Sequence, residues 1–370
     1  MKILFVVAHL RKGGPVDVMY NICRQVLHSS DSTIKIVTLR PEGENSKIEE
    51  FRKLGIEVFP FNFSYWQCEL LTGHITKRIQ QLVEQENIDI VHAHTYHPVL
   101  ACAQLKGVKK ISTLHNRATE DFLNVYGSIM GRYMLARYFK ALQTFDANIA
   151  VSQSAYELYQ SYIPHVGWVN NGVDTTTFQV VNTADSLSLR EKLGVSATAK
   201  IFVSTGRIEK EKGYIPLIEW FGRVSVHANA LLLILGDGRQ LQECKEVAAK
   251  NPKIIFTGRV DNVADYLQCA DYYISNSQSE GMSMAVCEGI ACGLYPILSN
   301  IPSHVDVAKG VDGFLFEQPD DIDLRKVLVS KHDRQSLHRY IESYFSIQSM
   351  GDGYLKVYHS LKRKNLHLTS

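Results

Sequence analysis

Short apolar runs alternate along this chain with segments that have helical periodicity. The first run is Ile3–Ala8, and in the following segment, Val16–Leu27, apolar residues recur every three or four positions. Strands that are buried on both faces read as continuous apolar runs, because helices cover both sides of a parallel sheet. The alternation therefore predicts an α/β fold built on parallel sheets.

The number of runs predicts two doubly wound, Rossmann-like domains, because it is too large for one sheet. The first-half strands are expected at Ile3–Ala8, Ile34–Leu39, Ile56–Phe59, Ile88–His92, Ile111–Leu114 and Ala147–Val151. The second-half strands are expected at Ile201–Thr205, Leu231–Leu235, Ile254–Phe256, Tyr272–Ser275, Tyr295–Leu298 and Gly313–Phe316. Polar, glycine-containing sequence near 170–195 interrupts the pattern. We expect domains at 1–175 and 176–340, and at 341–370 a helix that crosses back to the first domain and a basic tail.

Composition narrows the class of protein. The 370 residues are too many for one domain of about 150 residues. With 40 basic and 38 acidic residues the net charge is only +2, so no global field recruits nucleic acid. The apolar run at Ile3–Ala8 is far shorter than the roughly 20 residues of a membrane span, and no small-residue cleavage site follows it. We expect a cytoplasmic protein without a spanning helix or signal peptide.

Cysteine and histidine patterns argue against a metal site. The seven cysteines are scattered and include no C-x-x-C pair, which is typical of buried thiols in a reducing cytosol. His92, His94 and His97 lie close together and suggest metal ligands. Their spacing suits the alternation of a strand better, and no nearby carboxylate completes a ligand set. We therefore predict no metal.

Candidate chemistry lies in the loops after the strands, because ligands of open α/β sheets bind beyond the carboxyl ends of the strands. In the first half, Gly13-Gly14 opens a helix, where backbone N–H groups can approach a phosphate. In the second half, Arg207 and Lys212 flank a turn, and such cations suit a diphosphate; a solvated charged loop is the alternative. The turn Gly236-Asp237-Gly238 leaves room for a ligand.

Two glutamates mark the segment from Glu280 to Glu288, which follows a strand and opens a helix. Glu280 stands at the helix entrance, where the backbone from Met282 to Ala285 offers unpaired N–H groups. Glu288 lies two turns further in, among small and apolar neighbours. A carboxylate in such surroundings needs a partner, which points to a hydroxyl-bearing ligand; an exposed helix face is the alternative.

In this order, the motifs resemble the retaining nucleotide-sugar glycosyltransferases of glycosyltransferase family 4, which have the GT-B fold. The resemblance covers nearly the whole chain. Its motifs are Gly13-Gly14, His92-Ala93-His94, Thr113-Leu114-His115-Asn116, Ala150-Val151-Ser152, Asn171-Gly172-Val173-Asp174, Gly206-Arg207 with Lys212-Gly213, Gly236-Asp237-Gly238, and Glu280 to Glu288. Each motif is common by itself, but the ordered set, with seven residues between the two glutamates, is specific.

The resemblance implies a role for each candidate residue. Arg207 and Lys212 would bind the donor diphosphate, and Glu288 would bind the ribose hydroxyls. Glu280 would lie beside the donor sugar, and His115 would face the donor sugar or the acceptor. Further donor-binding positions would be Gly14, Gly236, Arg259, Val260, Gly281, Met282, Ser283 and Met284. No cofactor or metal is implied, and the co-substrate is a nucleoside-diphosphate sugar, expected to be a UDP-sugar.

The reaction implied by the resemblance is retaining hexosyl transfer to a hydroxyl of a glycan or lipid-linked saccharide, as in bacterial surface polysaccharide synthesis. Fixed cations and a helix N-terminus can stabilise the leaving phosphate without metal. The first half offers no evident nucleophile, and the resemblance implies front-face attack, in which the departing phosphate takes the acceptor's proton. Ser283 stands where the family commonly has proline or glycine and Tyr295 where it has proline, which leaves the donor sugar open.

Two other functions remain open from the sequence. A sugar-nucleotide epimerase would share the arginine, glutamate and glycine sites but would need no acceptor. A non-catalytic partner subunit of an active transferase would be expected to lack the diphosphate-binding residues that are present here.

Residues 100–140 carry seven basic side chains against two acidic ones, interleaved with aromatic residues. Such a segment suits the anionic inner face of a membrane or a polyprenyl-linked acceptor. The alternative is a helix packed on its own domain with its cations extending to solvent.

Overall fold

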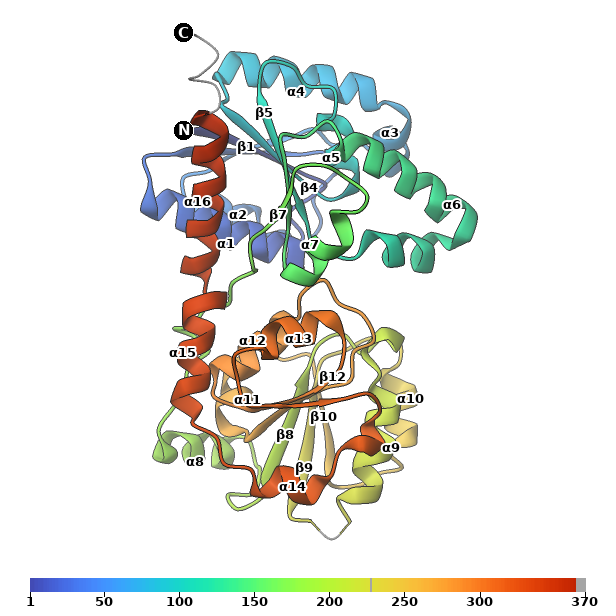
Figure 1. The fold of residues 1–370 in the computed structure, drawn as a ribbon, viewed down its shortest axis with the longest axis vertical. Helices are drawn as coiled ribbons and strands as arrows, with labels where there is room; N and C mark the ends of the chain where they lie inside the picture. The colour runs from blue at the N-terminus through green and yellow to red at the C-terminus, as the bar shows by residue number, and fades with distance from the viewer. Residues whose placement is uncertain (227, 364–370) are drawn as a thin grey trace. The chain divides into compact units, whose positions relative to one another are not determined.

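The computed structural model describes residues 1–226 and 228–363. The chain forms two compact units, one made of Met1–Gly172 and the chain from Ile347 onward, the other of Val173–Ser346. Each unit contains one parallel sheet with helices on both faces (Figure 1). The predicted α/β architecture with two parallel sheets is therefore confirmed, whereas most of the expected basic tail lies outside the described residues.

The first unit has a seven-stranded parallel sheet in the order β3-β2-β1-β4-β5-β6-β7. Its strands are β1 (Lys2–Val7), β2 (Thr33–Thr38), β3 (Glu57–Pro60), β4 (Ile90–His94), β5 (Lys109–Leu114), β6 (Ala147–Ala150) and β7 (Val166–Trp168). Its helices are α1 (Gly14–Ser29), α2 (Ile48–Lys53), α3 (Tyr65–Leu70), α4 (Thr72–Glu86), α5 (Tyr96–Cys102), α6 (Ala118–Leu142), α7 (Gln153–Tyr159) and α16 (Ile347–Arg363). The apolar pattern does not predict β7, because none of its three residues is buried.

Burial on both faces explains the continuous apolar runs. Side chains alternate along a strand, so neighbouring residues of β1 enter different cores. Leu4 and Val6 pack with residues of α4 and α5, whereas Ile3, Phe5 and Val7 pack with residues of α1 and α16. In register, Phe5 pairs with Ile36 of β2 and with His92 of β4.

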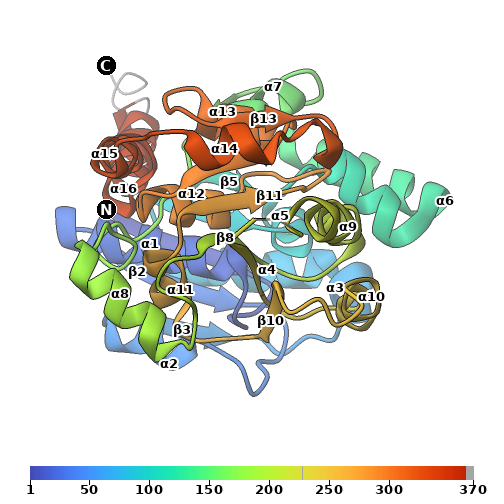
Figure 2. The ribbon, with the colours of Figure 1, turned by 90° about the horizontal axis from the view of Figure 1, so that it is seen from below.

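The second unit has a six-stranded parallel sheet in the order β10-β9-β8-β11-β12-β13. Its strands are β8 (Lys200–Thr205), β9 (Ala230–Leu235), β10 (Ile254–Gly258), β11 (Tyr272–Ser275), β12 (Tyr295–Ser299) and β13 (Phe314–Phe316). Its helices are α8 (Thr183–Lys192), η1 (Lys210–Lys212), α9 (Tyr214–Val224), α10 (Leu241–Val247), α11 (Val263–Cys269), α12 (Met284–Ala291), α13 (Pro302–Ala308), η2 (Pro319–Asp321), α14 (Leu324–Val329) and α15 (Arg334–Phe345). Helices lie on both faces of this sheet (Figure 2), with α9, α10 and α14 on one face and α12 on the other.

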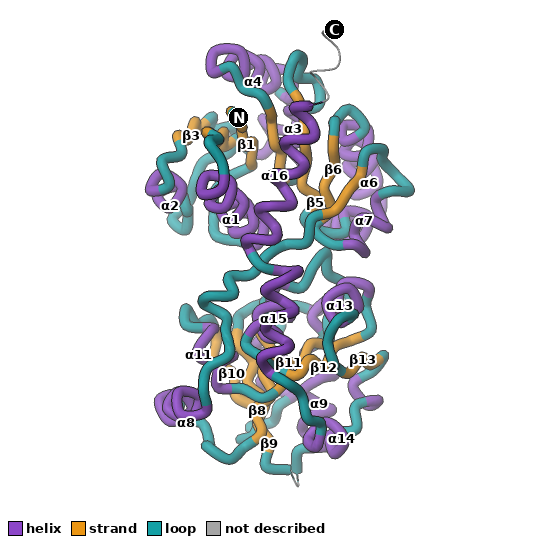
Figure 3. The backbone as a smooth tube through the Cα atoms, turned by 60° about the vertical axis from the view of Figure 1, so that its left-hand side comes forward, coloured by secondary structure: helices purple, strands orange, loops and turns teal. Residues whose placement is uncertain are grey.

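The last helix, α16, packs on α1 in the first unit (Figure 3). Gly351 permits the close approach, because a Cβ there would stand 2.1 Å from Cγ of Gln25. Tyr354 and Tyr358 of α16 are fully buried and bond to Thr113 at 2.9 Å and to His92 at 2.8 Å. These contacts attach the end of the chain to the first sheet.

Candidate active site

The polar site of the second unit lies where its strand order changes direction. β8 and β11 are neighbours in the sheet although they are far apart in sequence. The loops that leave two such strands open a crevice at the carboxyl edge, which is where ligands of α/β sheets bind. Lys212 follows β8 and Glu280 follows β11, so the topology brings these two residues to the same edge.

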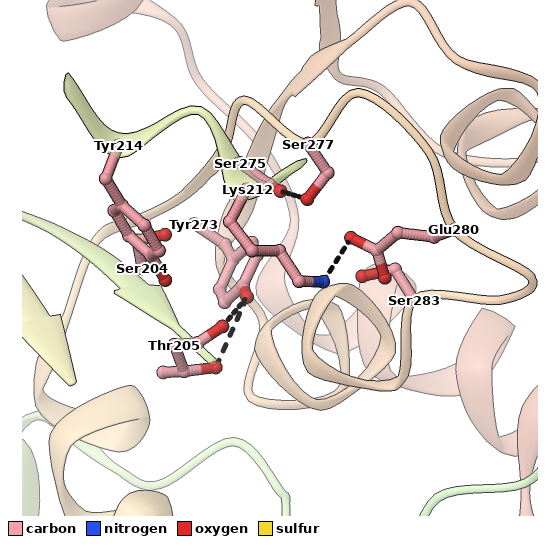
Figure 4. Close-up of a pocket in the computed structure, with 9 residues that line it drawn as sticks. All are labelled: Ser204, Thr205, Lys212, Tyr214, Tyr273, Ser275, Ser277, Glu280 and Ser283. Carbon is pink, nitrogen blue, oxygen red and sulfur yellow. Dashed lines mark hydrogen bonds and ion pairs between the residues drawn. The ribbon is translucent and has the colours of Figure 1, made fainter. Parts of the chain in front are cut away.

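A small polar pocket lies at this edge. Its lining residues are Ser204, Thr205, Lys212, Tyr214, Tyr273, Ser275, Ser277, Glu280 and Ser283 (Figure 4). Seven of the nine carry hydroxyl groups, so the wall offers hydrogen-bonding groups rather than an apolar surface. Such a pocket suits a ligand rich in oxygen atoms.

Lys212 and Glu280 form an ion pair in this pocket (Figure 4). Nζ of Lys212 lies 2.9 Å from Oε1 of Glu280, and the two side chains are 21% and 10% exposed. Burial alone would raise the pKa of Glu280, but the nearby His304 ring and the charge of Lys212 outweigh it and hold this pKa well below its ordinary value. Glu280 is therefore a carboxylate at neutral pH, and Lys212 is its counter-ion.

The turn that carries Lys212 depends on Gly213. Its φ of 62° is left-handed, and a Cβ would stand 2.3 Å from the carbonyl oxygen of Asn276. Asn276 in turn donates a hydrogen bond from Nδ2 to the carbonyl of Gly213 at 2.8 Å. This contact joins the loop after β8 to the loop after β11 and fixes Lys212 opposite Glu280.

The structure does not bring Arg207 into this pocket. The Arg207 side chain is 76% exposed, and its Nη2 lies 3.9 Å from Oε1 of Glu211. The Gly236 turn is packed against the chain, because a Cβ on Gly236 would stand 1.8 Å from the carbonyl oxygen of Gly206. Contact between two loops thus accounts for Gly236, and its role toward a ligand stays a prediction.

Helix α12 positions the second glutamate. The helix begins at Met284, directly after Gly281 and the buried residues Met282 and Ser283. Burial raises the pKa of Tyr273 well above its usual value, and the charges of Glu280 and Glu288 add to this shift. Both glutamates therefore border the region around Tyr273. Arg259 and Val260 follow β10 at the outer edge of the sheet, and Arg259 is exposed.

In the first unit, the order of the strands likewise reverses between β1 and β4, which are parallel neighbours. Gly14 opens α1 after β1, and a Cβ there would meet nothing within 4 Å. His115 follows β5, and its Nε2 lies 2.8 Å from Nδ1 of His94. The two ring nitrogens of His92 bond to Tyr358 and Thr113. Within residues 1–226 and 228–363, no group of three His, Cys, Asp or Glu side chains could hold a metal ion.

Acidification is expected to destabilise the protein, because histidines of the first unit are held neutral. Burial holds the pKa values of His92 and His94 well below the usual value, and neighbouring histidines lower them further. Burial also lowers the pKa of His115 to about 3. Below about pH 6.5 the unfolded chain binds protons that the folded chain does not, so the free energy of unfolding falls as the pH drops.

We expect His92→Gln to remove about 1 kcal/mol of the difference in unfolding free energy between about pH 7 and about pH 5.5. Urea denaturation at the two pH values measures this difference. His74→Gln changes an exposed histidine and should leave the difference unaltered. Identical pH dependence in wild type and His92→Gln would contradict the prediction.

The sequence interpretation missed His304, which lies on α13 and is fully buried. Its Nε2 is 3.7 Å from Oε1 of Glu280. The sequence signal that could have identified His304 is its position just after β12, because residues that follow parallel strands reach the same edge of the sheet.

Two Rossmann-like units, one with a hydroxyl-lined pocket around a lysine–glutamate pair, define a protein of the GT-B class. The chain is similar to the solved structure of Anabaena Alr3699/HepE in complex with UDP, with a TM-score of 0.79, 16% identity, and coverage of 97% of this chain and 100% of that chain. It is also similar to a glycosyltransferase from Rickettsia africae, with a TM-score of 0.77, 20% identity, and coverage of 97% and 98%. These likenesses establish the fold.

Two family models together match most of the sequence. Glycosyltransferase Family 4 matches residues 12–177, and Glycosyl transferases group 1 matches residues 185–344. The chain belongs to the family 4 glycosyltransferases, which confirms the predicted resemblance.

Curated relatives agree with this family. N-acetyl-alpha-D-glucosaminyl L-malate synthase of Bacillus anthracis is 26% identical over 297 residues, which cover 76% of this chain and 75% of the relative. UDP-Gal:alpha-D-GlcNAc-diphosphoundecaprenol alpha-1,3-galactosyltransferase of Escherichia coli is 25% identical over 281 residues, which cover 70% of each. The protein is thus a glycosyltransferase related to bacterial enzymes of glycolipid and polysaccharide synthesis.

Proposed function

We propose that this protein transfers a hexosyl group, with retention of configuration, from a UDP-sugar to a hydroxyl of a glycan or lipid-linked saccharide. The observation that carries the proposal is the Lys212–Glu280 pair at the carboxyl edge between β8 and β11. Uridine is the proposed base, since the Escherichia coli relative is named for UDP-Gal and the Anabaena structure contains UDP. Bacterial surface polysaccharide synthesis is the proposed setting, because the same relative is named for a diphosphoundecaprenol acceptor.

In the proposed reaction, Lys212 stabilises the negative charge that develops on the leaving diphosphate, and Arg207 turns toward it. The acceptor hydroxyl attacks the face from which the phosphate leaves. The bond from the sugar to the phosphate breaks, the bond to the acceptor oxygen forms, and the departing phosphate takes the hydroxyl proton. The two cations supply positive charge, so the proposed reaction needs no metal.

The remaining residues bind the donor. Glu288 holds the ribose, and Glu280 holds the donor sugar together with the backbone of the residues before α12. His115 faces the sugar or the acceptor. The other proposed donor contacts are Gly14, Gly236, Arg259, Val260, Gly281, Met282, Ser283 and Met284.

The proposal can be tested by incubating the purified protein with a panel of UDP-sugars and a lipid-linked saccharide acceptor in the presence of EDTA. We expect UDP release that depends on the acceptor. Isomerised nucleotide sugar formed without acceptor would favour the epimerase instead. No turnover with any donor would favour the partner subunit, and activity that returns only with Mg²⁺ or Mn²⁺ would contradict metal-independent transfer.

An apolar surface of the first unit suits contact with a membrane. Helix α6 bends sharply at Gly127, whose φ is 73°. Close to this bend in sequence, the side chains of Val125, Ile129 and Met130 are 71%, 87% and 52% exposed. Trp66 of α3 is 70% exposed. The described helices all fall short, in length or in apolar character, of what a bilayer span requires.

Basic residues accompany this surface. Arg132 and Lys140 of α6 are exposed, and Arg137 forms an ion pair with Glu69 of α3 at 2.5 Å, which joins the two helices. Apolar side chains beside cations are typical of segments that bind anionic lipid. In the proposed function, this surface brings the protein to the inner face of the membrane, where a lipid-linked acceptor would lie.

Ile129→Glu is expected to weaken binding to vesicles of phosphatidylglycerol and phosphatidylethanolamine by about ten- to hundred-fold, because burial of an isoleucine is worth about 1.5–3 kcal/mol. Co-sedimentation with the vesicles measures the effect. Val329→Glu, at a position of α14 that is 76% exposed, is the matched control and should bind as wild type does. Equal binding by both variants would refute the membrane role of this surface.

A further inference from the structure

His304 is a buried titratable residue beside the pocket that the proposed reaction does not use. Its Nδ1 lies 2.9 Å from the carbonyl oxygen of Ser299 and 3.1 Å from Oγ of the same residue. The Ser299 hydroxyl donates its proton to the carbonyl of Ser277 at 2.6 Å. A carbonyl oxygen can only accept, so Nδ1 of His304 carries a proton.

The second ring nitrogen of His304 faces a charge. Nε2 has no hydrogen-bond partner among the described residues and lies 3.7 Å from Oε1 of Glu280. In a neutral ring with its proton on Nδ1, Nε2 would present a lone pair to a carboxylate oxygen in a buried site, which is unfavourable. A second proton on Nε2 makes the contact attractive.

We propose that His304 is a positioning residue, protonated on both ring nitrogens, that holds Glu280 in place when Lys212 engages the donor diphosphate. In the structure Glu280 has two basic side chains beside it, Lys212 at 2.9 Å and His304 at 3.7 Å. Binding of a diphosphate draws Lys212 away from Glu280. A buried carboxylate that loses its counter-ion is costly, and His304 remains to compensate it.

The other charged groups around His304 do not replace Glu280 as its partner. Asp306 lies on the same helix and pairs with Lys309 at 3.2 Å. Helix α12, which packs against α13, contributes Glu288, which we assign to the ribose. The assignment of Lys212 to the diphosphate rests on the proposed function, whereas the protonation of His304 rests on the geometry alone.

NMR of the ligand-free full chain with ¹⁵N-labelled histidine tests the protonation. The His304 signal, identified by its loss in His304→Asn, should be that of an imidazolium at about pH 7 and should become neutral in Glu280→Gln. His338, whose Nδ1 bonds to the carbonyl of Ala291 at 2.7 Å, is the reference and should not respond. A neutral His304 ring in wild type, or an imidazolium unchanged in Glu280→Gln, would overturn the proposal.

Calorimetric titration with UDP tests the positioning role. Without the imidazolium, Glu280 should retain Lys212, so His304→Asn should weaken UDP binding by about ten-fold. The same substitution in a Glu280→Ala background should have no effect, because Lys212 is then free. Equal loss in both backgrounds would overturn the role. Absence of UDP binding by wild type would instead contradict the proposed donor, and NMR would still decide the protonation of His304.

Discussion

Lys212→Ala is expected to lower the rate of sugar transfer by about a hundred-fold or more, because Lys212 is a cation fixed where charge develops on the leaving diphosphate. Gly213 and Asn276 hold the turn that carries this side chain, and only 21% of the side chain is exposed. The positive charge is therefore in place before the reaction begins. Steady-state turnover with a UDP-sugar measures the effect, and circular dichroism checks the fold.

Lys210→Ala is the matched control for this change. Lys210 lies in the same short helix, η1, but its side chain is exposed and does not line the pocket. We expect near-normal turnover in this variant.

Arg207→Ala should lose activity as Lys212→Ala does, because in the proposed reaction the exposed guanidinium turns to the diphosphate. Near-normal turnover in both Lys212→Ala and Arg207→Ala, at matched folding, would refute the proposed diphosphate site.

Much of the fold is predictable from the sequence because most strands are buried on both faces. A strand such as β1 or β9 has almost no polar position, so its apolar run stands out from the periodic helices around it. Strand β7 is not predictable in this way. It has three residues at an edge of the sheet, and hydrogen bonds to β6 rather than burial define it.

The candidate site is predictable only in part. Lys212 and Glu280 can be found from the sequence because each follows a strand, but their contact depends on β8 and β11 being neighbours. Strand order is a property of the whole sheet and leaves no local pattern. The contact between Gly236 and Gly206 is likewise tertiary, because it joins the loops after β8 and β9.

His304 shows why a position just after a strand is not enough to predict the rest of the site. Nothing in the segment around it distinguishes a buried histidine from an exposed one. Ser299 is close to it in sequence, but Glu280 follows β11 and reaches it only when β11 and β12 pair in the sheet. The folded structure marks His304 as a functional candidate because its two ring nitrogens have different neighbours. Nδ1 bonds to the carbonyl of Ser299, and Nε2 faces Glu280.

Glu288→Ala should weaken UDP binding by about ten- to hundred-fold, because a charge-assisted hydrogen bond to the ribose is worth about 1.5–3 kcal/mol. Glu288 lies on α12, which is packed so closely on β11 that a Cβ on Gly289 would stand 2.3 Å from Tyr273. This close packing holds the helix in place, so it cannot easily shift to bring another group to the position of the lost carboxylate. Glu288→Gln keeps one acceptor oxygen and should lose less affinity.

Glu280→Ala should behave differently from Glu288→Ala. The loss of Glu280 frees Lys212 for the diphosphate, so UDP affinity should stay nearly unchanged. Transfer should still fall, because the donor sugar loses a hydrogen-bonding partner at the entrance of α12. Calorimetric titration of both variants with UDP, followed by turnover measurements, separates the two roles. If Glu280→Ala loses UDP and Glu288→Ala retains it, the roles are reversed: Glu280 then binds the nucleotide, and Glu288 acts on the sugar.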